Sequence, residues 1–66
     1  MSIVKVIEVI AEGKSVEEAV ESAVKEASKT IRNITGMDVV GFKAEVREGK
    51  IYEYRVHARI AFAVER

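Results

Sequence analysis

The chain has 66 residues, with eleven basic and eleven acidic side chains, a formal net charge of zero and no cysteine. A single domain of this size buries only about 60% of the surface that its unfolded chain exposes, and disulfides are excluded as a support. The balanced charge disfavours nucleic-acid binding, which requires a basic excess on one face. No apolar run approaches the roughly twenty residues that span a bilayer, so we expect a cytoplasmic protein that does not bind membranes.

The first predicted element is a strand over residues 3–11. It is rich in β-branched residues and is apolar on both faces apart from Lys5 and Glu8. This pattern predicts a well-buried strand. Residues 12–14, Glu-Gly-Lys, then break the alternation and mark its end.

A helix of about nineteen residues is predicted next. Ser15, followed by Glu18 three residues later, has the spacing of a capping box. Apolar residues then recur at steps of three and four and form one stripe: Val16, Ala19, Val20, Ala23, Val24, Ala27, Ile31 and Ile34. Asn33 and Gly36 are the expected stop signals. Because the stripe consists largely of alanine and valine, we expect the helix to pack closely against a sheet.

Two alternating runs, over residues 37–48 and 52–65, complete the chain. The connecting Glu48, Gly49 and Lys50 predict a β-hairpin with its reversal at the glycine. In the last run, one face is apolar: Tyr52, Tyr54, Val56, Ala58, Ile60, Phe62 and Val64. The opposite face carries the charged residues.

The predicted order is therefore β-α-β-β, an α+β fold. A right-handed crossover through the helix makes the first two strands parallel to each other, which leaves the third strand to pair between them or beside the second. We expect the long third strand to lie in the middle. The result is a single domain over residues 1–66, a three-stranded antiparallel sheet with one helix on its apolar face.

The strand over residues 52–65 is too long for this helix to cover. Its extended length is about 46 Å, whereas the predicted helix is about 28 Å long. His57 is the one histidine in a chain without cysteine, so a structural zinc site is disfavoured. Further copies of the same chain are then the expected source of cover, and we predict a homo-oligomer.

No catalytic motif is present in the sequence. It has no cysteine nucleophile, no Gly-x-Ser-x-Gly element and no phosphate-binding loop. His57 has the chemistry of a general base, but a histidine on an alternating polar strand face is more often solvated or in an interface. We therefore expect that the protein is not an enzyme.

Basic residues gather on the polar face of the expected sheet: Lys43, Arg55, His57 and Arg59. Repeated by symmetry, these side chains would bind phosphate or carboxylate groups of a ligand. The alternative is ion pairing, within or between subunits, with other charged residues of that face: Glu45, Arg47 and Glu53. A calcium site between subunits, from Glu8, Asp38 and Glu45, is a further alternative, although these acids lack the spacing of a calcium loop.

Three segments carry a resemblance to a known family: residues 27–34, Tyr54-Arg55-Val56 and Ile60-Ala61-Phe62. In this order and at this length they resemble the dodecins, and the resemblance covers nearly the whole chain. It implies a hollow homododecamer of cubic symmetry that stores or sequesters a flavin, such as riboflavin, lumichrome or FMN.

In flavin-binding dodecins, a tryptophan after the helix stacks on the isoalloxazine ring and a glutamine in the last strand hydrogen-bonds its edge. These positions fall on Gly36 and Arg55. Glycine removes a stacking contact worth about 1 kcal/mol, and a guanidinium group cannot accept a hydrogen bond. We predict a small-molecule storage protein with ligand-binding residues Gly36, Lys43, Arg55 and His57 and flavin as the family default. The alternative is a structural assembly without flavin that holds another anionic ligand or a metal ion such as calcium.

Overall fold

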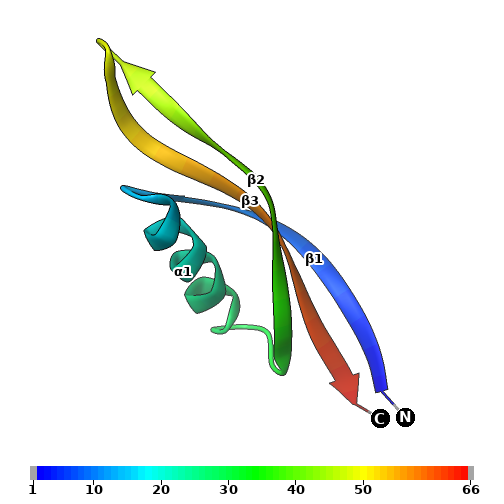
Figure 1. Cartoon of the computed structure of the whole chain (residues 1–66). Coiled ribbons are helices and arrows are strands. Elements are labelled where there is room, and N and C mark those ends of the chain that lie inside the picture. Colours follow the sequence, from blue (N-terminus) through cyan, green and yellow to red (C-terminus); the bar gives the residue numbers. More distant parts are fainter. Residues whose placement is uncertain (1, 66) are drawn as a thin grey trace.

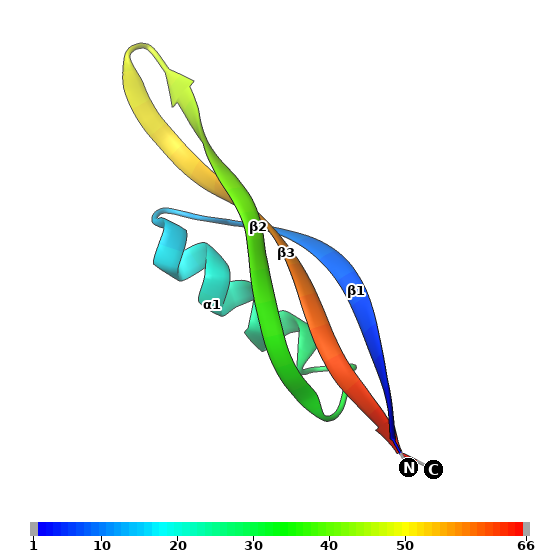
Figure 2. The ribbon, with the colours of Figure 1, turned by 45° about the vertical axis from the view of Figure 1, so that its right-hand side comes forward.

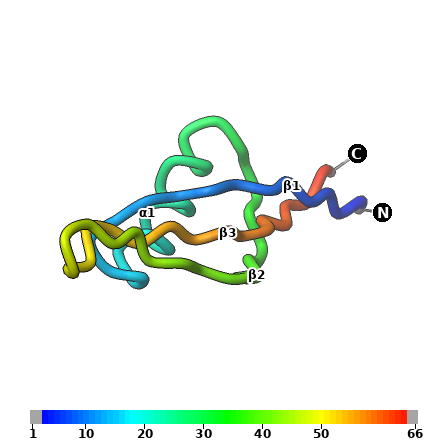
Figure 3. The backbone as a smooth tube through the Cα atoms, turned by 90° about the horizontal axis from the view of Figure 1, so that it is seen from above, coloured from blue at the N-terminus to red at the C-terminus, as the bar shows by residue number. Residues whose placement is uncertain are grey.

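The computed structural model describes residues 2–65, which form one helix and one sheet. Strand β1 (Ser2–Gly13) is followed by helix α1 (Val16–Ala27) and by strands β2 (Ile34–Arg47) and β3 (Lys50–Glu65). The strand order is β1-β3-β2, with both outer strands antiparallel to β3. Figure 1 shows α1 lying along one side of the sheet, and the three strands run side by side in Figure 3. The predicted central position of the last strand is confirmed.

Helix α1 begins where the capping box predicts and ends earlier than expected. The amide of Glu18 donates to Ser15 Oγ at 3.0 Å, and the Glu18 carboxylate accepts from the Lys14 amide at 2.9 Å. The helix has 12 residues, so the predicted nineteen is wrong. Ser28 Oγ donates to the Val24 carbonyl at 2.8 Å, a side-chain contact that suits a helix end. No helix of residues 2–65 is long and apolar enough to cross a membrane.

Two residues of the predicted helical stripe lie beyond the end of α1: Ile31 precedes the sheet and Ile34 is the first residue of β2. After a turn that ends at Thr30, Asn33 takes a left-handed backbone conformation with φ 62° and directs the chain into β2 at Ile34. Ile34 lies opposite Phe62 of β3. Ile34 therefore belongs to the sheet and not to the helix. Its side chain lies on the same face of the sheet as that of its cross-strand partner Phe62.

A two-residue turn joins β2 to β3. Arg47 and Lys50 are paired, and Glu48 and Gly49 between them have φ of 51° and 75°. Two successive positive φ values are those of a type I′ turn, which matches the twist of antiparallel strands. The predicted hairpin is confirmed, with Gly49 at the position where a positive φ suits glycine best.

The core is small and consists mostly of alanine. Its buried residues are Ala19, Ala23, Ala27, Val56, Ala58 and Ile60. The three from β3 are fully buried on the face predicted to be apolar, and the helix contributes only alanine. Short side chains let α1 approach β1 and β3 closely, but they bury little apolar surface per residue.

The prediction that the first strand is well buried is wrong within the single chain. β1 is an edge strand, and its exposed side chains include Val4 at 60%, Val6 at 56% and Ile10 at 68%. The helix covers only the face that carries the odd-numbered residues of β1, because side chains alternate along a strand. The apolar even-numbered residues of this strand therefore require cover from outside the chain.

The chain as a whole is elongated and rich in exposed apolar side chains. It measures 52 × 19 × 13 Å, and its radius of gyration is 13.8 Å, against about 11 Å for a compact domain of this length. Its accessible surface is 5064 Å², about 900 Å² more than a compact monomer of 7.3 kDa exposes. Within the described part of the chain, ten large hydrophobic side chains are exposed. These features favour association, as predicted from strand length.

Replacing Gly13 tests the close contact between β1 and α1. A Cβ atom there would lie 2.8 Å from the backbone nitrogen of Ala19, a distance that forces the backbone to shift. We expect Gly13→Ala to lower the free energy of unfolding by about 1–3 kcal/mol. The measurement is denaturant unfolding at one fixed protomer concentration. Gly36→Ala is the matched control, because a Cβ at Gly36 meets no atom within 4 Å; equal effects of the two variants would contradict the packing argument.

Candidate functional site

The face of the sheet that points away from α1, called the outer face here, places charged residues of all three strands in rows. Each row takes one residue from β1, one from β3 and one from β2: Glu12, Arg55 and Lys43; Ile10, His57 and Gly41; Glu8, Arg59 and Asp38. Residues in a row are direct cross-strand neighbours, so their side chains interact. The central strand thus presents three basic groups in succession.

Arg55 is paired with an acid that the sequence analysis did not assign to it. Its Nη2 and Nε donate to Oε2 of Glu12 at 2.7 and 3.0 Å, and its Nη2 lies 3.9 Å from Glu53 Oε2. The hydrogen bond and the charge of Glu12 raise the pKa of the Arg55 guanidinium. A signal for this pairing exists in the sequence, because Glu8 and Glu12 share one face of the first strand.

His57 and Arg59 share the second acid of β1. Glu8 Oε2 lies 3.0 Å from His57 Nε2 and 3.6 Å from Arg59 Nε. Ion pairing on this face was the alternative to ligand binding, and it is present. The partners come mainly from β1, although Arg47 and Glu45 also pair at 3.3 Å as that alternative expected.

Three of the four predicted ligand-binding residues lie around one hollow of the outer face. This hollow, of about 350 Å³, is lined by Ile10, Val40, Gly41, Phe42, Lys43, Arg55 and His57. Its apolar walls are exposed, with Ile10 at 68% and Val40 at 48%. Among residues 2–65, Lys43 has no acidic partner within 4.0 Å. We call this region the basic hollow.

Gly36, the fourth predicted residue, lies further along the same face. It is opposite Ala61 and lines a separate hollow with Asp38 and Arg59. Ala61 is six residues from Arg55 along β3, which corresponds to roughly 20 Å. One small ligand bound to a single chain therefore cannot contact both positions. The space at Gly36 is open, since a Cβ there would meet no atom within 4 Å.

Glu53 lies at the acidic end of the outer face. Its side chain is 20% exposed, and Glu45 is its direct neighbour on β2. Partial burial raises the pKa of the Glu53 carboxyl, and the negative charges of Glu12 and Glu45 raise it further. Arg55 opposes this shift. The balance of charge around Arg55 is therefore sensitive to pH.

The described residues form no metal centre by themselves. Within residues 2–65, no three His, Cys, Asp or Glu side chains gather in a way that would hold a metal ion. Of the acids considered for calcium, Glu8 and Asp38 lie on either side of Arg59, and Glu45 lies opposite Glu53. A calcium site between subunits stays a prediction.

Comparison with known proteins shows which family this chain belongs to. The sequence model of the dodecin family matches residues 3–65. The chain belongs to the dodecin family. A search of the curated proteins finds no match.

Solved dodecin structures share the whole fold. Dodecin from Streptomyces coelicolor is 26% identical, with a TM-score of 0.93 over 98% of this chain and 94% of that one. A point mutant of Thermus thermophilus dodecin is 25% identical, with a TM-score of 0.93 over 100% and 98% of the two chains. Dodecin from Streptomyces davaonensis, at 20% identity and a TM-score of 0.92 over 98% and 97%, supports the fold alone.

Family membership establishes a general role for the chain. The dodecin family is one of homo-oligomeric proteins that bind small molecules, flavins in particular, and dodecameric assembly is a family property. The β-α-β-β order and the three-stranded antiparallel sheet agree with the dodecin structures. The predicted family and fold class are confirmed.

Neutralising Glu53 tests the charge balance of the outer face. The folded-state pKa of this group lies above its ordinary value of 4.5, so its ionised form opposes folding at neutral pH. That opposition disappears as the pH falls through the raised pKa and below 4.5. We expect Glu53→Gln to raise the unfolding midpoint at pH 7.5, with a gain that shrinks towards pH 4. Glu48→Gln in the turn is the control, and destabilisation by Glu53→Gln at pH 7.5 would contradict the assignment.

Proposed function

We propose that the chain forms a homododecamer that binds and sequesters a small molecule with an apolar, planar body and an anionic group. The observation that carries this proposal is the basic hollow, where Lys43, Arg55 and His57 surround exposed apolar side chains. A concave, mainly apolar site with few polar groups is typical of small-molecule binding. The same hollow repeats on every copy in a symmetric assembly.

The arrangement of positive charge favours an anionic group. Lys43 and Arg55 are direct cross-strand neighbours, and like charges in this position repel each other. Glu12 neutralises only Arg55. A phosphate or carboxylate above the pair would accept charge-assisted hydrogen bonds from both side chains and remove the repulsion.

The apolar walls favour a flat hydrophobic body. Ile10 and Val40 border the hollow from the two edge strands and are 68% and 48% exposed. Covering such surface contributes about 25 cal/mol per Å². FMN combines a planar ring with a phosphate, and flavin is the family default. Because Gly36 lacks the stacking ring of flavin-binding dodecins, we propose that this chain binds flavin more weakly than they do.

A storage role fits the groups that are present better than catalysis does. Within residues 2–65, the one histidine of the outer face is held by Glu8, and no nucleophile and base pair is evident. We therefore propose a cytoplasmic binding protein that does not turn its ligand over. The balanced charge of the chain supports partners that are small molecules and other copies of itself.

Comparing FMN with riboflavin isolates the contribution of the anionic group, because the two share the ring and differ in the phosphate. We expect FMN to bind at least several-fold more tightly, measured by quenching of flavin fluorescence, and Lys43→Ala to remove most of that difference. Glu12→Gln should act in the opposite direction, because it frees Arg55 from its internal acid. Equal affinities for the two flavins would contradict anion recognition. If an intact assembly binds neither flavin and is not affected by phosphate, the structural alternative is correct.

Restoring the aromatic ring tests the position of Gly36. A Cβ atom at Gly36 would meet no atom within 4 Å, so a side chain can leave the backbone there without a clash. We expect Gly36→Trp to increase flavin affinity by about tenfold or more, a change that corresponds to at least 1.4 kcal/mol. Fluorescence quenching measures the effect, and Glu17→Trp, on the exposed surface of α1 and outside both hollows of the outer face, is the control. No gain from Gly36→Trp would show that Gly36 does not face the ligand.

A further inference from the structure

The hairpin between β2 and β3 extends beyond the rest of the molecule. The pairing of β1 with β3 ends at Gly13 and Tyr54, whereas β2 and β3 stay paired as far as Arg47 and Lys50. Figures 1 and 2 show this part as a two-stranded arm that projects past β1 and α1. We call residues 45–53 the hairpin arm. A two-stranded ribbon is marginally stable without a third layer.

The arm carries an uncovered apolar pair. Val46 and Ile51 are cross-strand partners, with 60% and 55% of their surface exposed. A register shift between Glu45 and Val46 adds local twist at this point. Because β1 does not reach this part of β3, the pair has no third strand beside it within the chain.

The base of the arm is held in place. The Arg47 guanidinium lies 3.7 Å from the centre of the Tyr52 ring, and Lys14 Nζ lies 4.7 Å from it. Lys14 Nζ also donates to the Tyr52 carbonyl at 3.3 Å. These contacts tie the arm to the loop before α1, so Val46 and Ile51 are presented by a fixed element.

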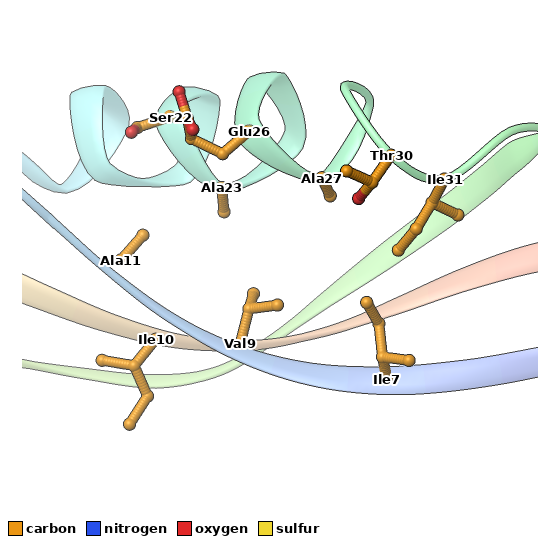
Figure 4. Close-up of a pocket in the computed structure, with 10 residues that line it drawn as sticks. All are labelled: Ile7, Val9, Ile10, Ala11, Ser22, Ala23, Glu26, Ala27, Thr30 and Ile31. Atoms are coloured by element: carbon orange, nitrogen blue, oxygen red, sulfur yellow. The ribbon is translucent and has the colours of Figure 1, made fainter.

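A complementary surface lies between α1 and β1. A hollow of about 430 Å³ there has apolar walls made by Ile7, Val9, Ala11, Ala23, Ala27 and Ile31. In Figure 4, Ala23 and Ala27 of the helix face Val9 and Ile7 of β1 across this space. Ser22, Glu26 and Thr30 supply its polar groups. We call it the helix hollow.

The arm cannot fill the helix hollow of its own chain. Val9 of the hollow lies opposite Ala58, which is seven residues from Ile51 along β3. Seven residues of a strand span roughly 23 Å, and the sheet keeps these positions apart. Any arm that enters the hollow therefore belongs to another copy.

We propose that the hairpin arm of one copy inserts Val46 and Ile51 into the helix hollow of a second copy. This inference rests on the homo-oligomer of the proposed function. The excess surface of about 900 Å² matches one partner's share, about 800 Å², of a standard protein interface. The two surfaces differ, so the contact is head-to-tail, and in a closed assembly such contacts form rings.

Cysteine cross-linking tests this contact directly, because the natural chain has no cysteine. The assembled double variant Val46→Cys with Thr30→Cys is oxidised mildly and run on a non-reducing gel. We expect cross-linked species of two or more chains, and only single chains from either cysteine alone. Val46→Cys with Thr35→Cys is the matched control, because Thr35 lies on β2 outside the helix hollow. Absence of cross-links from the first pair, or equal cross-linking of the control, would overturn the proposal.

A charge on the arm provides the second measurement. We expect Val46→Asp to retain the circular dichroism of a folded chain and to lose the assembled peak in light scattering. If the unchanged protein assembles and Val46→Asp assembles equally well, the arm contact is refuted and the oligomer of the proposed function stands. If the unchanged protein is a monomer of 7.3 kDa, the proposed function fails first. Where Val46→Asp does not fold, the cross-linking result decides.

Discussion

The close contact of a short, alanine-faced helix with a long strand determines most properties of this protein. α1 spans about 18 Å and β3 about 53 Å, so one helix covers only the middle of the strand it packs on. Gly13 and Ala19 allow the close approach. The apolar surface beyond the helix stays exposed at both ends of the sheet. Only further protein can bury it, which explains why a homo-oligomeric family uses this fold.

The outer face of the sheet shows how an edge strand can balance the charge of its neighbour. β1 supplies Glu12 to Arg55 and Glu8 to His57 and Arg59, and leaves Lys43 without an acid. These pairs are exposed to solvent, so they add little stability. Their main effect is on charge, because they offset most of the positive charge of this face. The remaining positive charge is at Lys43, next to the apolar walls of the basic hollow.

The dodecin structures keep this fold at 20% to 26% identity. Low identity is compatible with one fold because the alternation of β3 and the small residues of α1 can be met by many sequences. A ligand site has no such tolerance, since it depends on a few individual side chains. Gly36 and Arg55 illustrate the difference, because neither disturbs the sheet and both stand at positions of the predicted ligand site.

The sequence by itself determined the order of elements, the start of α1 at Ser15, the turn at Gly49 and the apolar face of β3, because each depends on local spacing or on alternation along one strand. It also indicated the family and the placement of Arg55, His57 and Arg59 on one face of β3. Only the tertiary structure decided where the helix ends, how much of β1 stays exposed, and that Glu12 lies beside Arg55. The last two depend on packing and on register between segments far apart in sequence, which a period read along the chain does not contain.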